Sequence, residues 1–247
     1  MFKNIKDQFP IFKKKIKGKE LVYLDSANSS QKPQSVIDAV SNFYSNEFAN
    51  VGRGIYTLAV NASEMYENSR SSLKNFIGAS SDFEIVFTKN ATESLNLVAS
   101  CFGEKFIEKD DEIILTELEH HANYVPWHFL RKKKGAVIKF LPIDENGNLK
   151  IEQLESLITS KTKIISVTHM SNVTGSISSL EEIIEIAKKH SIPVCVDGTQ
   201  GAAHLEVDVK KLDCDFYAFS GHKMYGPTGV GLLAIKYKWL EVFEPFI

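Results

Sequence analysis

Cysteine is scarce in this sequence, which has only Cys101, Cys195 and Cys214 among 247 residues. Their positions show none of the paired spacings of zinc sites, and so few cysteines do not suggest a disulfide framework. We therefore expect no metal site. We also expect a reducing compartment, the cytoplasm, because disulfides persist mainly in oxidising ones.

Long apolar runs and a strong excess of charge are absent as well. The longest apolar stretches are too short to span a bilayer, and the basic start MFKNIKDQFPIFKKKIKGK lacks the continuous apolar segment of a signal peptide. The sequence has 29 Lys and Arg against 31 Asp and Glu, which gives a net charge of −2. This balance offers no electrostatic reason to bind nucleic acid or an anionic membrane, and we expect neither as a partner.

The pattern that is present alternates short apolar runs with amphipathic segments. We predict strands at residues 84–87, 112–115, 136–141, 163–168, 192–196, 216–219 and 230–235. We predict helices at residues 91–101, 123–133, 151–158 and 180–190. Such alternation predicts an α/β fold with a mostly parallel sheet that helices cover.

The segment before residue 84 has a less regular pattern. We interpret residues 1–20 as a polar lead-in and residues 21–247 as one large domain. Residues 21–24 are predicted as a strand, and a helix is predicted to begin at Pro33. A loop is predicted over residues 46–59, followed by a second helix from 60 to 77.

The most informative stretch is SGHKMYGPTGVG, which connects the last two predicted strands and holds Lys223. A lysine held in an apolar pocket has a lowered pKa and can form a Schiff base with a carbonyl. Ser220 and His222 beside it suit an anion such as phosphate. The alternative is a surface hairpin with a solvated lysine, and the glycines here fit neither the dinucleotide fingerprint nor the P-loop spacing.

Polar residues also follow other predicted strands, at the edge where ligands bind in such sheets. Asp197 can keep a ring nitrogen protonated, or it can cap the next turn. Thr92 belongs to a helix start that suits an anion or ordinary capping. His120 can stack on a flat ring, donate a proton or bind a metal, although a metal needs three or four convergent ligands. Asn172 is either part of this edge or an ordinary loop residue.

Together these residues place four features at one edge of the sheet. They are a phosphate site, a platform for a flat ring, a carboxylate and a lysine. Pyridoxal phosphate requires this combination, since it needs phosphate anchoring, ring stacking, a counter-charge for its pyridine nitrogen and a lysine amine.

Four stretches closely resemble the class V aminotransferase family: EHHANYVPW (119–127), SVTHMSNVTGS (166–176), VDGTQGAAH (196–204) and DFYAFSGHKMYGPTGVG (215–231). The nearest group is the cysteine desulfurases of the sulfur-mobilisation type, which overlap the selenocysteine lyases. The resemblance runs from YLDSANSSQKP to the end of the chain. It implies the large domain of the type I fold of pyridoxal-phosphate-dependent transferases.

The resemblance implies roles for residues around the cofactor ring. Lys223 carries the Schiff base, and His120 stacks on the pyridine ring and takes part in proton transfer. Asp197 pairs with the pyridine nitrogen, and Gln200 hydrogen-bonds the phenolic oxygen.

It also implies contacts to the phosphate and to the substrate. Thr92, Ser220 and His222 hold the phosphate group. Asn172 also belongs to the cofactor site, and it lies near the substrate together with Arg53.

The implied reaction removes sulfur from L-cysteine and leaves L-alanine, with selenocysteine as the alternative substrate. An enzyme cysteine becomes a persulfide and passes the sulfur to an acceptor protein for iron–sulfur cluster assembly. Members of the family act as homodimers.

The sequence also departs from the family pattern. Family members continue beyond residue 247 into a small C-terminal domain that carries the persulfide cysteine and a substrate-binding arginine. None of the three cysteines here matches that nucleophile, and Cys101 is predicted at the end of a helix. Two hypotheses follow. The chain is the N-terminal part of a cysteine desulfurase, with little activity alone, or it is a non-catalytic remnant or interaction protein that keeps the cofactor fold.

Overall fold

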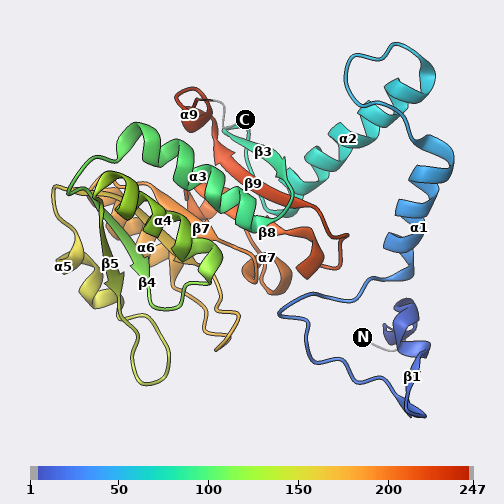
Figure 1. Ribbon diagram of the computed structural model, residues 1–247, viewed down its shortest axis with the longest axis horizontal. Coiled ribbons are helices and arrows are strands. Elements are labelled where there is room, and N and C mark those ends of the chain that lie inside the picture. Colours follow the sequence, from blue (N-terminus) through green and yellow to red (C-terminus); the bar gives the residue numbers. More distant parts are fainter. Residues whose placement is uncertain (1–4, 245–247) are drawn as a thin grey trace.

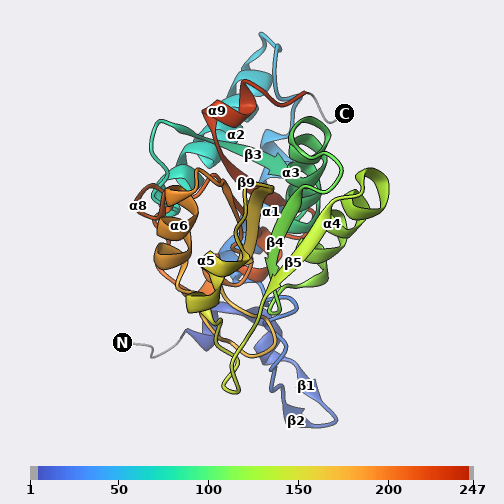
Figure 2. The ribbon, with the colours of Figure 1, turned by 90° about the vertical axis from the view of Figure 1, so that its left-hand side faces the viewer.

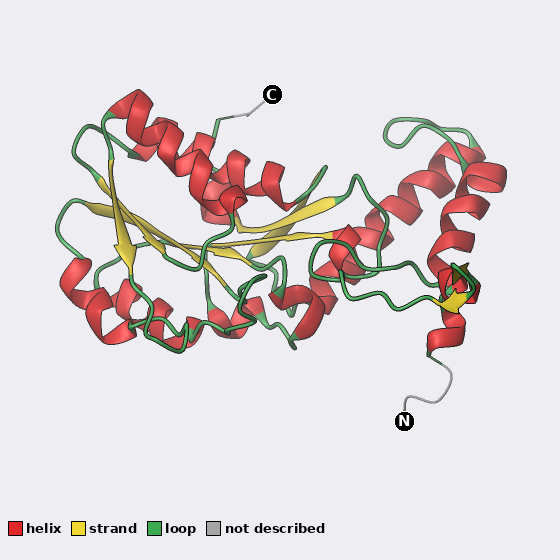
Figure 3. Cartoon of the chain, turned by 60° about the horizontal axis from the view of Figure 1, so that its bottom comes forward, coloured by secondary structure: helices red, strands yellow, loops and turns green. Residues whose placement is uncertain are grey.

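Seven strands form a sheet at the centre of the molecule, and helices cover both of its faces (Figures 1 and 3). The computed structural model describes residues 5–244. The strands lie in the order β3-β9-β8-β7-β6-β4-β5. Their bounds are Phe83–Thr88 (β3), Glu112–Thr116 (β4), Val137–Leu141 (β5), Thr162–Thr168 (β6), Val194–Asp197 (β7), Phe216–Ser220 (β8) and Gly231–Lys236 (β9).

The remaining elements surround this sheet or precede it. The α-helices are Gln34–Asn42 (α1), Thr57–Phe76 (α2), Ala91–Phe106 (α3), His121–Lys134 (α4), Leu154–Leu157 (α5), Leu180–Lys189 (α6), Gly201–His204 (α7), Val209–Leu212 (α8) and Tyr237–Leu240 (α9). Shorter helical turns are Lys6–Gln8 (η1), Pro10–Lys13 (η2), Phe43–Glu47 (η3), Ile151–Gln153 (η4) and Gly221–Lys223 (η5). A small hairpin pairs Lys15–Ile16 (β1) with Lys19–Glu20 (β2).

The sheet is mostly parallel, as the alternating pattern predicts. Strands β8, β7, β6, β4 and β5 pair in parallel, and β9 runs antiparallel between β3 and β8. The exception has a physical reason. Parallel neighbours need a long crossover connection, whereas β8 and β9 are joined by a short one that includes η5, so they can only pair antiparallel.

Two apolar cores lie on opposite faces of the sheet (Figure 2). Helices α3 and α4 cover one face, where Leu95 and Trp127 are fully buried. Helix α6 and the short helices α5, α7 and α8 cover the other, where Ile183 and Ile184 are buried. Each large apolar side chain buried in this way contributes about 1.5–3 kcal/mol. The two layers fix the strand ends, and with them the edge that carries the polar residues.

The residues before β3 form a less packed region. Helix α1 and the outer part of α2 extend away from the sheet (Figure 1). We call residues 21–60 the N-terminal arm. Its side chains include Leu24, which is 92% exposed, and Ile55, which is 97% exposed. The predicted strand at 21–24 is wrong, because this segment pairs with no strand among the described residues.

Other sequence predictions differ from the structure in their boundaries. The second helix begins at Thr57 instead of residue 60, and Cys101 lies inside α3 instead of at a helix end. The lead-in of residues 1–20 contains η1, η2 and the β1–β2 hairpin within its described part. The short helices α7, α8 and α9 were not predicted, because four residues are too few to show a helical period. Across residues 5–244, no helix combines the length and apolar character needed to cross a membrane.

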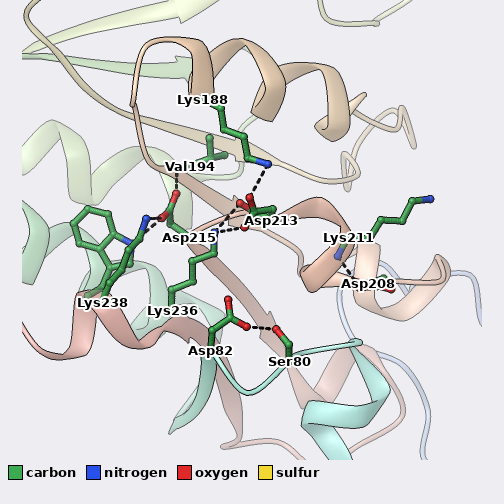
Figure 4. Close-up of polar contacts among 11 residues, drawn as sticks. Ser80, Asp82, Lys188, Val194, Asp208, Lys211, Asp213, Asp215, Lys236 and Lys238 are labelled. Atoms are coloured by element: carbon green, nitrogen blue, oxygen red, sulfur yellow. Dashed lines mark hydrogen bonds and ion pairs between the residues drawn. The ribbon is translucent and has the colours of Figure 1, made fainter.

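At the edge opposite the polar residues, the side chain of Asp215, just before β8, binds β7 and α9 (Figure 4). Its carboxylate accepts hydrogen bonds from the backbone N–H of Val194 in β7, at 3.0 Å, and from the indole N–H of Trp239 in α9, at 2.9 Å. Lys238 approaches the same carboxylate at 2.6 Å. Because Asp215 is 7% exposed, these donors compensate for the loss of its hydration.

Candidate functional site

A cavity of about 300 Å³ opens where the ends of β6, β7 and β8 meet the first turns of α3 and α4. This is the edge at which open α/β sheets bind ligands. The structure brings together all the residues predicted for the site except Arg53. The predicted residues that line the cavity are Thr92, His120, Asn172, Asp197, Gln200, Ser220, His222 and Lys223.

Lys223 lies at the end of η5, directly after β8. Burial lowers the pKa of its amine, and the carboxylate of Asp197 opposes that shift. A lowered pKa increases the fraction of neutral amine, which is the nucleophilic form. The side chain is half-buried, so the amine remains open to the cavity.

Asp197 ends β7 and is 4% exposed. Its Oδ1 atom accepts two hydrogen bonds from Thr199, one from the backbone N–H at 3.0 Å and one from the hydroxyl at 2.5 Å. Burial raises the pKa of Asp197, while Thr199 and the charges of His120 and Lys223 oppose the rise. No group among the described residues donates to the other oxygen, Oδ2. Asp197 therefore caps a turn and still offers an acceptor to the cavity.

The first turn of α3 forms the anion-binding part of the cavity. The side chain of Asn90 caps the helix by accepting the N–H of Glu93 at 2.8 Å. Ser220 accepts the N–H of Ala91 at 2.8 Å and keeps its own hydroxyl proton for another acceptor. Thr92 adds a hydroxyl and an N–H of the first helical turn, where amides lack helical partners and favour anions.

Gly231 allows this part of the cavity to form. It begins β9 and passes against the backbone of Asn90. A Cβ atom at position 231 would lie 2.2 Å from the carbonyl carbon of Asn90, which is impossibly close. Only glycine therefore lets β9 pair with both neighbours while α3 begins beside Ser220.

His120 is the N-cap residue of α4, and its ring is exposed at the cavity. The Nδ1 atom accepts the backbone N–H of Ala122 at 3.1 Å. A neutral imidazole that accepts at Nδ1 carries its proton on Nε2. The helix cap thus fixes the tautomer and leaves Nε2 as the atom that can exchange a proton with a ligand.

Residues 27–32 bind two of the residues that line the cavity, His222 and Gln200. Ser30 donates its backbone N–H and its hydroxyl to the carbonyl of His222, each at 3.0 Å. Lys32 donates to the same carbonyl at 2.9 Å, and burial lowers the pKa of its amine. Gln200 donates its amide N–H to the carbonyl of Ala27 at 2.7 Å, so one of its two amide protons is already used.

By the chemistry of its groups, the cavity fits pyridoxal phosphate. The hydroxyls and amides at the start of α3 suit a phosphate group. The free oxygen of Asp197 suits a protonated ring nitrogen, and the amine of Lys223 suits an aldehyde. The exposed ring of His120 provides a surface for stacking.

Comparison with known proteins agrees with this geometry. Residues 22–247 match the family described as Aminotransferase class-V. The chain belongs to the class V aminotransferase family.

Several relatives within this family are desulfurases by name. A protein named "Probable cysteine desulfurase" from Halalkalibacterium halodurans is 46% identical over 98% of this chain and 59% of its own length. The solved structure of a cysteine desulfurase from Thermococcus onnurineus NA1 is 39% identical, with a TM-score of 0.93, over 100% of this chain and 60% of that one. SspA, solved in complex with cysteine, is 29% identical, with a TM-score of 0.84, over 92% of this chain and 65% of that one. The chain thus spans about 60% of the length of these relatives.

Arg53 does not belong to the cavity of this class V chain. It is exposed in the loop between η3 and α2, within the N-terminal arm. Its neighbour Gly52 donates its backbone N–H to the hydroxyl of Ser63 at 3.0 Å, which ties the loop to α2. The contact of Arg53 with a substrate stays a prediction.

The cysteines of this class V chain lie outside the cavity too. Cys195 and Cys214 are fully buried, and burial raises the pKa of both thiols, to about 12 for Cys214. Cys101 lines a different and larger cavity of about 860 Å³ between α3 and α4, and burial raises its pKa as well. Within residues 5–244, no cluster of His, Cys, Asp and Glu side chains is arranged to hold a metal ion.

Sequence reasoning missed Thr199 and Glu119. Thr199 was detectable, because a hydroxyl residue two positions after an aspartate commonly bonds back to it. The carboxyl group of Glu119 accepts hydrogen bonds from Thr116 at 2.6 Å, Asn123 at 2.6 Å and the backbone N–H of Thr168 at 2.8 Å. These partners come from β4, α4 and β6, so sequence spacing alone gave no signal for this cluster.

Proposed function

We propose that this chain acts in a pyridoxal-phosphate-dependent cysteine desulfurase, which removes sulfur from L-cysteine and leaves L-alanine. The sulfur becomes a persulfide on an enzyme cysteine and passes to an acceptor protein for iron–sulfur cluster assembly in the cytoplasm. One observation carries the proposal. The lowered-pKa amine of Lys223 and the open oxygen of Asp197 line one cavity, in a chain 46% identical to a protein named as a cysteine desulfurase.

The residues of the cavity divide the work of binding and proton transfer. Thr92, Ser220 and His222 hold the phosphate group. The oxygen Oδ2 of Asp197 would accept a hydrogen bond from the protonated ring nitrogen, and Gln200 would donate one to the phenolic oxygen. When bound, pyridoxal phosphate supplies an electron sink for bond breaking next to the substrate amine.

The substrate end of the cavity is assigned to His120, Lys223 and Asn172. Nε2 of His120 is the atom that would exchange a proton with the substrate, because Nδ1 is occupied by the helix cap. Lys223 would hold the cofactor through its amine, and the same amine could move a proton at the substrate. Asn172 offers an amide to the substrate. The solved complex of SspA with cysteine supports cysteine as that substrate.

A titration with pyridoxal phosphate tests the proposal. The wild-type chain is expected to develop an absorbance band near the visible edge, because Lys223 condenses with the cofactor aldehyde. Lys223→Ala is expected to lose the band, and Lys210→Ala, which removes an exposed lysine from α8, is expected to keep it. An unchanged band in Lys223→Ala would reject the assignment.

A second prediction concerns turnover. None of the three thiols lines the cavity, and the pKa of each is raised, so none is placed to attack the sulfur of a bound cysteine. We expect this chain alone to release little or no alanine from L-cysteine, measured by amino-acid analysis. Alanine release that disappears in a Cys101→Ser variant would contradict this prediction.

We propose a second copy of the chain as a partner. The N-terminal arm exposes Leu24, Ile55 and Phe48, and an apolar surface of this kind is typical of an interface. Arg53 lies in the same arm, so docking of a second copy provides a route for its guanidinium to a substrate. Sedimentation equilibrium is expected to show a dimer that Ile55→Glu weakens and Ile16→Glu, in the β1–β2 hairpin, does not. A monomer at all concentrations would contradict this proposal.

A further inference from the structure

Two buried polar side chains beneath the cavity have no role in the function proposed above. His169 follows β6 and is 8% exposed, and Tyr217 lies within β8 and is fully buried. The Nδ1 atom of His169 and the hydroxyl of Tyr217 are 2.9 Å apart. The rings meet edge to face, with centroids 5.9 Å apart and an interplanar angle of 85°. Because β7 lies between β6 and β8 in the sheet, the pair reaches across the end of β7.

The chain leaving β7 rests directly on these two rings. A Cβ atom on Gly198 would lie 2.1 Å from the ring of Tyr217, and one on Gly201 would lie 2.5 Å from Nδ1 of His169. Neither position has room for a side chain, so the backbone is in contact with the pair at two points. Between these points lie Thr199 and Gln200, and Asp197 comes just before them.

Two backbone hydrogen bonds hold the same segment to the strands on either side. The N–H of His169 donates to the carbonyl of Asp197 at 2.9 Å, and the N–H of Gly198 donates to the carbonyl of Ala218 at 2.8 Å. The segment is therefore held laterally by the sheet and supported from below by the rings. These two backbone hydrogen bonds do not by themselves fix the distance between the segment and the sheet, because neither involves a residue from Thr199 onward.

We propose that His169 and Tyr217 are positioning residues, which together hold the segment from Asp197 to Gly201 at the height where Asp197 and Gln200 face the cavity. Asp197 and Gln200 line the cavity, and each contributes one polar group to it. The inference that the two rings hold this segment in position rests on the contacts alone. Its consequence for pyridoxal phosphate rests on the proposed function.

Burial favours the neutral forms of both side chains. Burial lowers the pKa of His169, opposed by the charge of Glu181 in α6. Burial also raises the pKa of Tyr217, and the charges of Cys214 and Asp197 add to that shift. Two neutral side chains can share one hydrogen bond between Nδ1 and the hydroxyl, which suits a fixed support.

Tyr217→Phe is the sharpest variant, because it keeps the ring under Gly198 and removes only the hydroxyl. His169 is then left with a buried, unpartnered Nδ1. Tyr124→Phe makes the same chemical change in α4, outside the cavity, and serves as the control. His169→Gln keeps a polar group within reach of Tyr217, whereas His169→Leu does not.

The first readout is hydrogen exchange of the amides of residues 198–202 in the cofactor-free protein. We expect about tenfold faster exchange in Tyr217→Phe and His169→Leu, since about one buried hydrogen bond is lost. His169→Gln is expected to recover part of the protection, and Tyr124→Phe to leave it unchanged. The second readout is the dissociation constant for pyridoxal phosphate, which is expected to rise about tenfold in the same two variants.

The outcomes separate this inference from the proposed function. Exchange and affinity within about twofold of the wild type in Tyr217→Phe would overturn the inference and leave the function standing. Faster exchange spread evenly over the whole sheet would also overturn it, because the pair would then serve general stability. Faster exchange confined to residues 198–202, in a wild-type protein that binds no pyridoxal phosphate, would support the positioning role and reject the proposed function.

Discussion

At the scale of single residues, Glu119 has an unusual environment. The residue is partly exposed, but its carboxyl group is enclosed by Thr116, Asn123 and Thr168. Burial raises its pKa to about 8, and the charge of Asp197 adds to the shift, against the three donated hydrogen bonds. A folded-state pKa above the unfolded value means that the folded protein prefers the protonated acid. The stability linked to this group is therefore present below about pH 4.5 and is lost as the pH rises through about 8.

Glu119→Gln tests this linkage, because the amide resembles the protonated acid and does not titrate. The Tm of the variant relative to the wild type is expected to increase by about 3 °C or more between pH 5 and pH 9. Differential scanning calorimetry across that range measures the difference. Glu117→Gln, which changes an exposed acid of the same loop, is the control. Parallel pH dependence in Glu119→Gln and the wild type would show that Glu119 does not carry the linkage.

The residues of the site differ in how far sequence could predict them. Lys223 and Asp197 stand directly after apolar runs, and parallel strands bring such positions to one edge, so their meeting was predictable. The hydrogen-bond cluster around Glu119 was not predictable, because its partners come from three elements that only the folded sheet brings together. The exclusion of Arg53 from the cavity was not predictable either, since it depends on the direction in which α1 and α2 leave the sheet.

At the scale of elements, the edge opposite the cavity depends on Asp215. Asp215→Ala leaves the buried N–H of Val194 and the indole N–H of Trp239 without an acceptor. We expect a loss of about 3 kcal/mol in the free energy of unfolding. Urea denaturation measures this loss.

The neighbouring Asp213 provides the control for this element. Its side chain is 45% exposed and pairs with Lys188 and Lys236 (Figure 4). Asp213 has a φ of 59°, a backbone conformation that asparagine tolerates, so Asp213→Asn is the suitable change. We expect it to cost less than about 1 kcal/mol. Equal losses of unfolding free energy in the two variants would show that burial does not increase the contribution of Asp215 to stability.

The elements themselves were predictable where their period was long enough. Strands buried on both faces, such as β6 and β8, gave clear apolar runs, and the long helices gave clear stripes. Residues 21–24 have the composition of a strand but no neighbour to pair with among the described residues. Propensity alone cannot supply that neighbour, because strands form only by pairing with others.

At the scale of the whole molecule, the two layers of helices and the sheet bring distant stretches to one cavity. Its lining comes from residues between Asn28 and Lys223, and Gly198 and Gly201, which flank two of these residues, contact Tyr217 and His169. The fold class followed from the order of strands and helices in the sequence. The exposure of the N-terminal arm could not be predicted from the sequence, because sequence patterns cannot show which apolar side chains lack a partner.

The central claim is that these groups converge on one aldehyde cofactor at Lys223. The most direct test is to add pyridoxal phosphate, reduce the protein with borohydride and locate the added mass by peptide mass spectrometry. The account predicts one modified position, Lys223, with no modification in that peptide for Lys223→Ala. Modification spread over exposed lysines of the lead-in, such as Lys13 and Lys14, with none at Lys223, would contradict it.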